Sequence, residues 1–407
     1  MSTSDRKLRI AVWHNLPSGG GKRALYYHVR GLLERGHSVE VWRPPAGDDT
    51  YLPLAPLARE HIVPLAWDEQ RQTGGLARWR MAVGMIRAAE QHCRRCTDEI
   101  NRGAFDVVFA NSCRLLRVPP LARFLQSPSV IYLAEPYRTL YEALPRLPWA
   151  ALPWPAGPLA IARDEVRVHG LRILVREEVR NAAAFGAILT NSLYSRESLL
   201  RAYGIESRVC YLGVDTALFV NQGRQREKMV AGVGAFAPEK NIAAVISALA
   251  ALPAPRPRLV WVGNVAAQRY FETLRDQAAS SGVAFEPRLD ISDSELVDLL
   301  NRAALMVYAP RLEPFGLAPL EANACGLPVV AVAEGGVRET VIDGVNGLLV
   351  SYSSELPAAM QRLLRDPKLA HRLGNQGAQI VRERWSLDAA VDRIEQALYA
   401  ATERKPA

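Results

Sequence analysis

The sequence predicts an α/β protein built from two domains, each with a parallel sheet covered by helices. The chain has 407 residues, which is more than one hydrophobic core usually supports. Short β-rich apolar runs alternate with stretches of helical length from the start of the chain, as in parallel sheets with helices on both faces. This alternation starts again after residue 228, so we expect one domain over residues 1–212 and a second over residues 213–385.

The expected strands of the first half are short runs that are rich in Val, Ile and aromatic residues. They are Leu8–Trp13, Ser38–Trp42, Asp106–Ala110, Ser129–Leu133 and Ala187–Thr190. Helices are expected between them, including Lys22–Arg35 and Leu76–Asn101.

The second half repeats the pattern and adds clear helix signals. Strands are expected at Met229–Val233, Arg258–Val262, Leu305–Tyr308 and Pro328–Val332, and helices at Asn241–Ala251 and Ala267–Ser280. Ser292 followed three residues later by Glu295 predicts a capping box at the start of another helix. A last helix is expected from about Leu387 to Thr402.

The most informative segment contains two carboxylates separated by seven residues, Glu313-Pro-Phe-Gly-Leu-Ala-Pro-Leu-Glu321. Its flanking strands predict Glu313 in a loop at the carboxyl end of a strand. Glu321 is expected in the first turn of the next helix, with Pro319 near its first position. Ligands bind at this edge of open parallel sheets. The backbone N–H groups of residues 315–318 would suit a phosphate.

This segment resembles the retaining glycosyltransferases of the family 4 type, whose signature is E-P-F-G-L-x-x-L-E-A followed by G-x-P-V-V-A. The match runs from Glu313 to Ala331. Further matching blocks are Gly213–Phe219, Val233–Asn241, Gly335-Gly336 and Asp343–Gly347. The resemblance implies a GT-B fold, in which two Rossmann-like domains face each other across a cleft. It also implies that a helix within residues 386–407 crosses back to complete the N-terminal domain.

The resemblance implies roles for the charged residues of the second domain. Lys240 would meet the diphosphate of a nucleoside diphosphate sugar, Glu321 would accept hydrogen bonds from ribose hydroxyls, and Glu313 from the transferred sugar. The alternatives are a solvated lysine at a helix start and a glutamate that is favoured there by the helix dipole. The remaining donor-binding candidates are Gly20, Gly21, Gly263, Asn264, Phe315, Gly316 and Leu317.

One departure from the family pattern affects the diphosphate site. The family usually has Arg where this chain has Ala235, and a lost charge-assisted hydrogen bond costs about 1.5–3 kcal/mol. Arg311, two residues before Glu313, is our candidate for the missing charge.

Gly19-Gly20-Gly21 follows the first expected strand and precedes a helix. Glycines at such a turn let a backbone approach a ligand, and a helix N-terminus favours an anion. The alternative is a tight turn that binds nothing. The resemblance favours a loop that faces the donor phosphates or the acceptor.

The acceptor-side candidates follow other strands of the first domain. In Ala134-Glu135-Pro136 the family usually has His in place of Ala134, so Glu135 is our catalytic candidate there. Asn111 follows the strand Asp106–Ala110, and Arg138 follows the Glu135 segment. Both are assigned to the acceptor side, and the alternative for Asn111 is a helix cap.

Composition limits the other roles. No Asp-x-Asp pair occurs, and Cys93-x-x-Cys96 lacks the second ligand pair of a zinc site, so neither a metal nor a cofactor is expected. Net charge +8 favours an anionic surface, and nothing suggests nucleic acid. The Pro- and Trp-containing stretch Leu147–Ala162 is either a segment that dips into a membrane interface or an ordinary apolar loop. We expect a cytoplasmic protein without a signal peptide.

Three functions remain open from the sequence. The first is a hexosyltransferase that uses a nucleoside diphosphate sugar and a saccharide or lipid-linked acceptor, in bacterial cell-surface polysaccharide or glycolipid assembly. The second is a catalytically degenerate subunit that binds a nucleotide or a partner, which Ala134 and Ala235 favour. The third is a nucleotide-sugar epimerase on the same scaffold.

Overall fold

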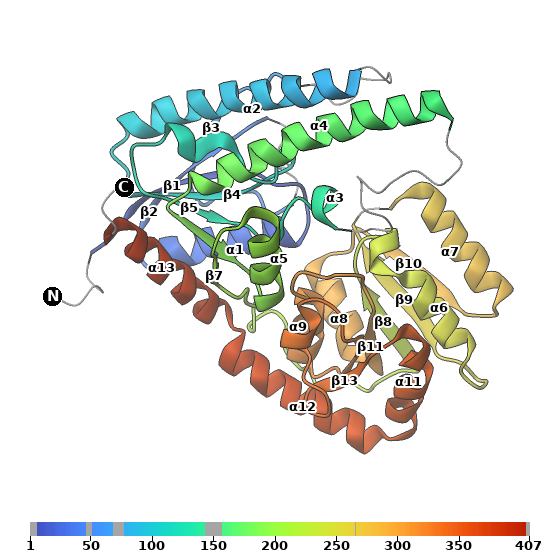
Figure 1. Cartoon of the computed structure of the whole chain (residues 1–407). Coiled ribbons are helices and arrows are strands. Elements are labelled where there is room, and N and C mark those ends of the chain that lie inside the picture. Colours follow the sequence, from blue (N-terminus) through green and yellow to red (C-terminus); the bar gives the residue numbers. More distant parts are fainter. Residues whose placement is uncertain (1–5, 46–50, 68–76, 143–156, 265, 404–407) are drawn as a thin grey trace. The chain divides into compact units, whose positions relative to one another are not determined.

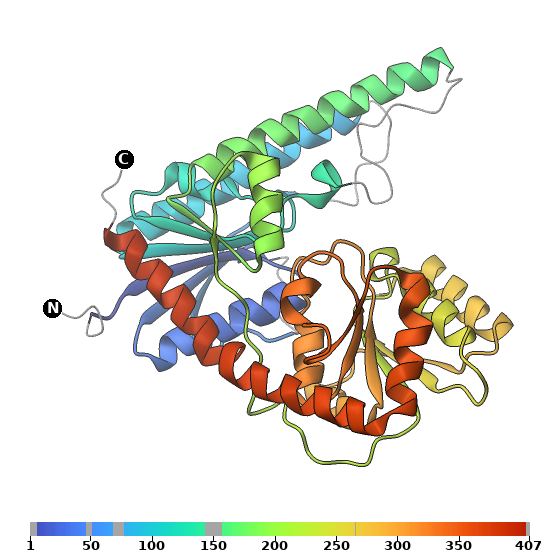
Figure 2. The ribbon, with the colours of Figure 1, turned by 60° about the horizontal axis from the view of Figure 1, so that its bottom comes forward.

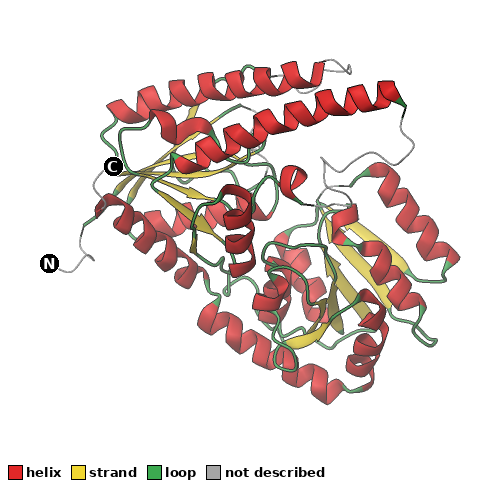
Figure 3. Ribbon diagram, in the orientation of Figure 1, coloured by secondary structure: helices red, strands yellow, loops and turns green. Residues whose placement is uncertain are grey.

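The computed structural model describes residues 6–45, 51–67, 77–142, 157–264 and 266–403. The chain forms two compact units. The first contains residues 1–191, 195–210 and 391–407, and the second contains residues 192–194 and 211–390. Each unit has one sheet, drawn in yellow in Figure 3, with helices around it. The prediction of two α/β domains with parallel sheets is confirmed.

The first unit has a parallel sheet with the strand order β3-β2-β1-β4-β5-β6-β7. The chain order reverses beside β1, as in doubly wound folds. The strands are β1 (Arg9–Asn15), β2 (Ser38–Arg43), β3 (Arg59–Ile62), β4 (Val107–Cys113), β5 (Ser129–Tyr132), β6 (Ala187–Thr190) and β7 (Arg208–Val209).

Helices cover both faces of this sheet. They are α1 (Gly20–Glu34), α2 (Ala77–Arg102), the short η2 (Pro120–Phe124), α3 (Arg138–Tyr141), α4 (Pro158–Ala183), α5 (Leu193–Tyr203) and α13 (Leu387–Glu403). The long helices α2 and α4 lie side by side (Figures 1 and 2). They share a core with α5 and with the sheet residues Ala11, Val108 and Ile131. On the opposite face, α1 brings His28 against Phe109 and Tyr132.

Strand β3 was not predicted, and its sequence explains the omission. Its residues Arg59-Glu-His-Ile62 are mostly polar, because β3 is an edge strand with one open side. His61 stacks on Trp42 of β2, with ring centroids 4.2 Å apart, and its Nε2 lies 2.7 Å from a Glu40 carboxylate oxygen. These side-chain contacts with β2 replace the apolar pattern of an interior strand.

The last helix, α13, packs on the first unit through its residues from Val391 onward. A side chain on Gly31 of α1 would clash with Val391, since an added Cβ would lie 2.4 Å from its Cγ2. Arg35 pairs with Asp392 at 2.7 Å and with Glu395 at 2.8 Å. The helix that was expected to return to the N-terminal domain therefore does so.

The second unit has a parallel sheet in the order β10-β9-β8-β11-β12-β13. Its strands are β8 (Met229–Val233), β9 (Arg258–Gly263), β10 (Phe285–Leu289), β11 (Leu305–Tyr308), β12 (Val329–Val332) and β13 (Gly347–Val350). The central strands β8 and β11 are neighbours although they are far apart in the chain, which brings the loops after them together.

The helices of this unit are η3 (Pro238–Lys240), α6 (Ile242–Ala250), α7 (Gln268–Ser280), α8 (Asp293–Arg302), α9 (Leu317–Ala324), α10 (Val337–Thr340), η4 (Ser353–Glu355), α11 (Leu356–Arg365) and α12 (Pro367–Arg384). Residues of α6, α7 and α11 share one core with the sheet. The predicted capping box of α8 is confirmed, with Ser292 and Glu295 bonded to each other's backbone N–H groups.

The stretch Leu147–Ala162, weighed as a membrane-interface segment, lies outside the described residues up to residue 156. From Pro158 onward it is the start of α4 and therefore not a loop. Within the described ranges, no helix has both the length and the apolar content that crossing a membrane requires.

Candidate functional site

Two predicted site residues of the second unit, Lys240 and Glu313, contact each other. The Lys240 Nζ donates a hydrogen bond to the Glu313 Oε2 at 2.7 Å. Lys240 ends η3, which follows β8, and Glu313 lies in the loop after β11. Because these parallel strands are neighbours, their carboxyl ends bring the two side chains to the same edge of the sheet. Both side chains are partly exposed, at 23% and 15%, so a ligand can reach the pair.

The loop that carries Glu313 is held in place by hydrogen bonds between its backbone and the loop that follows β12. Leu312 has a φ of 50°, an unfavourable value for a non-glycine residue, and its N–H donates to the Glu334 carboxylate at 2.6 Å. The N–H of Gly336 donates to the Glu313 carbonyl at 2.8 Å. A Cβ at Gly335 would lie 2.3 Å from that carbonyl oxygen. The Gly335-Gly336 pair is therefore needed so that the two loops can touch.

Helix α9 begins directly after this loop. Gly316 is its N-cap residue with a φ of 95°, and no side chain caps the helix. The prediction that Glu321 lies in the first turn was wrong. The helix begins at Leu317, so Pro319 is its third residue and Glu321 lies in the second turn. The Phe-Gly pair lets the helix begin earlier than Pro319 suggested, because glycine adopts the left-handed conformation at little cost.

Tyr308, at the end of β11, is a site residue that the sequence analysis missed. Its side chain is buried, and it hydrogen-bonds Glu313. Burial raises the pKa of Tyr308 well above its ordinary value, and the Glu313 and Glu321 carboxylates raise this pKa further. The phenol therefore stays protonated and serves as a donor to Glu313. A tyrosine that ends an apolar strand gave no signal to distinguish it from a core residue.

The predicted Gly263 lies beside the backbone that supports Lys240. Gly234 has a φ of 151°, and a Cβ there would lie 3.2 Å from the Lys240 Cδ. A Cβ at Gly263 would lie 2.7 Å from the Gly234 carbonyl oxygen, which also accepts a hydrogen bond from the Trp261 indole at 2.8 Å. Asn264 follows at the end of β9 and is exposed.

Arg311, the candidate replacement for the arginine missing at Ala235, lies next to the Lys240 turn through its backbone. Its N–H donates to the Glu239 carbonyl at 2.7 Å. Its side chain is 61% exposed, and its Nε lies 3.0 Å from the Glu334 carboxylate. To bind a diphosphate, the Arg311 guanidinium would have to leave Glu334 and contact the phosphate oxygens instead.

In the first unit, the structure brings together the predicted residues Glu135 and Arg138. The Glu135 carboxylate lies 3.0 Å from Arg117 Nη2 and 3.7 Å from Arg138 Nε. Arg138 also pairs with Glu142 at 2.5 Å. Two guanidinium groups therefore lie beside the Glu135 carboxylate.

Gly20 and Gly21 open α1, after the N-cap residue Gly19. A Cβ at Gly20 would meet no atom within 4 Å, so the described part of the chain leaves space beside this turn. At Gly21 the nearest atom would be a Leu16 methyl carbon at 3.6 Å.

Asn111 lies inside β4, which runs to Cys113, so the prediction that it follows the strand was wrong. The strand continues past the apolar run, because Asn111 pairs with Tyr132 of β5 and Cys113 pairs with Asn15 of β1. Asn111 is buried, and among the described residues its Nδ2 has no hydrogen-bond partner.

His14, near the end of the neighbouring strand β1, is a second residue that the sequence analysis missed. It is buried, and its Nε2 has no hydrogen-bond partner within the described ranges. Burial, with smaller contributions from Lys22 and Arg43, lowers the pKa of His14 well below its ordinary value, so the ring is neutral. Its place directly after the predicted strand Leu8–Trp13 was the available signal. Unpartnered buried polar atoms such as these are expected where a polar ligand binds.

Metal ligation has no support in the described residues, where no three His, Cys, Asp or Glu side chains gather as a metal site requires. The expectation that neither a metal nor a cofactor is needed stays a prediction.

The second half of the chain matches a known family. Residues 215–380 match the family model described as glycosyl transferases group 1. The D-inositol 3-phosphate glycosyltransferase of Acidothermus cellulolyticus is 33% identical over 58% of this chain and 57% of its own length. The MMP alpha-(1->4)-mannosyltransferase of Mycolicibacterium hassiacum is 31% identical over 68% of this chain and 66% of its own length. The chain thus spans less than two thirds of either relative.

Among solved structures, Anabaena Alr3699/HepE in complex with UDP-glucose has a TM-score of 0.70 and 21% identity, covering 97% of this chain and all of that one. This likeness confirms the GT-B class of fold for the chain. The segment 215–380, which contains Lys240, Glu313 and Glu321, is the part of the chain that matches the family model of the glycosyl transferases group 1.

Proposed function

We propose that this chain is a retaining glycosyltransferase that moves a hexosyl group from a nucleoside diphosphate sugar to a saccharide or lipid-linked acceptor. The observation that carries the proposal is the Lys240–Glu313 pair beside the start of α9, in a segment that matches the family model. The glycosyltransferase names of the relatives and the UDP-glucose complex of the structural neighbour support it. We further propose a cytoplasmic role in bacterial cell-surface polysaccharide or glycolipid assembly, with peripheral membrane contact favoured by the net charge of +8.

In the proposed donor complex, each partner of the pair takes a different part of the ligand. The Lys240 ammonium moves to the diphosphate, and the freed Glu313 carboxylate accepts hydrogen bonds from the sugar hydroxyls. The N–H groups at the start of α9 face the phosphate, and Glu321 accepts from the ribose hydroxyls. Gly263 and Asn264 line the nucleotide, and Gly20 and Gly21 approach the donor or the acceptor.

The proposed chemistry needs no metal and no cofactor. The bond between the anomeric carbon and the phosphate oxygen breaks, and its electron pair stays on the departing nucleoside diphosphate. The acceptor oxygen bonds to the same face of the sugar and passes its proton to that phosphate. Lys240 and the α9 amides stabilise the charge on the leaving group. Asn111, Glu135 and Arg138 position the acceptor in this proposal.

A panel of nucleoside diphosphate sugars tests the function, with release of the nucleoside diphosphate as the measurement. We expect Lys240→Ala to reduce turnover by about 10²–10³-fold, as the loss of one preorganised donor does. Lys228→Ala is the matched control, because Lys228 is exposed and precedes β8 at the opposite end of the strand. This control should leave turnover unchanged.

The alternative functions give different products in the same assay. Bound but intact donor in every combination would favour the degenerate subunit, which Ala134 and Ala235 motivate. An altered sugar that is still attached to its nucleotide would favour an epimerase. Equal loss of turnover in the Lys228 and Lys240 variants would contradict the proposed role of Lys240.

A further inference from the structure

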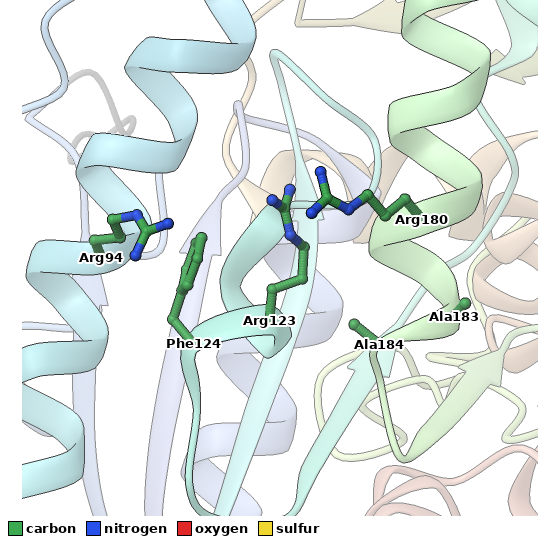
Figure 4. A pocket seen from close by; sticks show the side chains of 6 residues that line it. All are labelled: Arg94, Arg123, Phe124, Arg180, Ala183 and Ala184. Carbon is green, nitrogen blue, oxygen red and sulfur yellow. The ribbon is translucent and has the colours of Figure 1, made fainter.

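An open hollow of about 480 Å3 lies on the first unit, and none of its lining residues is among those assigned above. Its lining contains three arginines from three different elements, as Figure 4 shows. The lining residues are Arg94 of α2, Arg123 and Phe124 of η2, Arg180 and Ala183 of α4, and Ala184.

This hollow lies at the amino-terminal edge of the sheet. Phe124 ends η2 shortly before β5 begins, and Ala183 ends α4 shortly before β6 begins. In a parallel sheet, all strands start at one edge and end at the other. Glu135 follows the carboxyl end of β5, so the hollow is at the opposite edge from the acceptor-side candidates.

Arg123 is fixed in position by acidic partners. Its guanidinium lies 2.7 Å from the Glu90 carboxylate and 2.6 Å from the Glu177 carboxylate, and it donates to the Asn181 side chain at 3.2 Å. The side chain is only 12% exposed. Two carboxylates thus offset its charge and hold its remaining N–H groups in a set direction.

The other two arginines add positive charge that these carboxylates do not balance. Arg94 stacks on the Phe124 ring with its guanidinium carbon 3.9 Å from the ring centre, which fixes the plane of the group. The Arg180 guanidinium points toward that of Arg123 (Figure 4). Two guanidinium groups that converge across an open hollow repel each other, and an anion between them removes this cost. Three guanidinium groups against two carboxylates leave an excess of one positive charge.

We propose that this hollow binds a phosphate-bearing anion, held by the Arg94 and Arg180 guanidinium groups with Arg123 as the fixed support. Guanidinium groups match phosphate oxygens with paired N–H donors. The hollow has room for more than one phosphate group, so a diphosphate or a phosphorylated headgroup fits the chemistry. Because it lies at the edge opposite to the catalytic candidates of its own unit, its occupant is distinct from the proposed acceptor.

The test is a calorimetric titration of the full chain with inorganic pyrophosphate at constant ionic strength. We expect Arg180→Gln and Arg94→Gln to weaken binding by at least about tenfold, which is the effect of one lost charge-assisted hydrogen bond. Arg176→Gln is the control, because Arg176 is an exposed arginine on the same helix that does not line the hollow. It should change binding by less than about twofold by the same arithmetic. Arg123 is left intact because its removal would leave two carboxylates unpaired.

Two further arms identify the source of the phosphate and separate this site from the donor site. Binding that persists in Lys240→Ala and is lost in Arg180→Gln belongs to the hollow. Co-sedimentation with phosphatidylglycerol vesicles, lost in Arg180→Gln and kept in Arg176→Gln, would identify a lipid headgroup. Retention of pyrophosphate alone would identify a soluble phosphate compound. The proposal is overturned if neither probe binds, or if Arg176→Gln weakens binding as much as Arg180→Gln does.

Discussion

At the scale of single residues, the two glutamates of the motif should have separable effects. Glu313 contacts Lys240 and Tyr308, whereas Glu321 lies one turn into α9. We expect Glu321→Ala to weaken nucleotide binding and Glu313→Ala mainly to lower turnover. Calorimetric affinities for the nucleoside diphosphate, together with initial rates, measure the two effects. The reverse pattern would overturn the assigned roles.

Tyr308 gives a sharper prediction at this scale, because replacing it by Phe removes a single oxygen atom. Tyr308→Phe keeps the buried ring and removes the hydroxyl that bonds Glu313. We expect turnover to fall by roughly 10-fold, the value of one hydrogen bond to a charged group. The melting temperature should change little, since Glu313 keeps Lys240 as a partner. A steady-state assay at saturating donor checks this, and unchanged turnover would show that the phenol has only a packing role.

The sequence pointed to Lys240, Glu313 and Glu321 because each belongs to a motif with a fixed spacing. It did not point to Tyr308 or His14. Tyr308 ends β11 and His14 lies near the end of β1, and their chemistry depends on which carboxylates or cations lie across the fold from them. Such neighbours come from strand order, which a single sequence does not record.

At the scale of elements, the segment Asp343–Gly347, which matches the family pattern, has a structural role through Asn346. Asn346 is fully buried, and its Nδ2 donates to the Asn323 Oδ1 at 2.9 Å and to the Thr340 carbonyl at 2.8 Å. Its Oδ1 accepts from the Ile342 N–H at 2.6 Å. The amide thus ties α9, α10 and the turn before β13 together.

We expect Asn346→Ala to lower the free energy of unfolding by at least about 3 kcal/mol, because each buried polar group left unpaired costs about 1–3 kcal/mol. Urea unfolding of the full chain measures the change. Asn375→Ala is the control, because Asn375 is exposed on α12 and bonds only its neighbour His371 among the contacts that the structure gives. A loss no larger than that of the control would contradict the bracing role.

Most elements could be predicted because apolar runs and caps are local signals. Strands β6 and β8 agree with their predicted bounds, and the α8 capping box is present. Strand β3 could not be predicted, because its residues are mostly polar. They suit the edge of the sheet, where His61 stacks on Trp42 of the neighbouring strand. The start of α9 was misplaced because Pro319 suggested a later first turn than the left-handed Gly316 allows.

At the scale of the whole molecule, the restart of the strand–helix alternation predicted two α/β units, and the C-terminal helix returns to the first one. That return depends on contacts between residues distant in the chain, such as Arg35 with Glu395. The sequence indicated the return only through the family resemblance.

Stability of the molecule should depend on pH through Glu178, which is buried on α4. Its Oε2 accepts from the Val118 N–H at 3.0 Å and from the Tyr203 hydroxyl at 3.2 Å. Burial raises the pKa of Glu178 to about 8, despite the opposing hydrogen bonds. The folded chain therefore holds a proton that the unfolded chain releases above pH 4.5. Its contribution to stability is complete below pH 4.5 and is lost as the pH rises toward 8.

We expect Glu178→Gln to reduce this pH dependence, because the amide has no proton to release and its oxygen can keep both hydrogen bonds. The loss in the parent chain is about 1.4 kcal/mol for each unit between the unfolded and folded pKa. Melting temperatures of both proteins at pH 5 and pH 8 give the comparison. Equal shifts in the two proteins would show that Glu178 does not contribute.

The contact between Lys240 and Glu313 also has a consequence for selectivity. Without a bound ligand, the Lys240 ammonium is already paired with the Glu313 carboxylate. A small inorganic anion would have to displace this carboxylate, so its binding would be weak. A molecule that offers hydroxyl groups to the carboxylate and oxyanions to the ammonium compensates both partners at once. Cellular phosphate should therefore compete weakly, and the saccharide portion should count toward retention as well as the nucleotide.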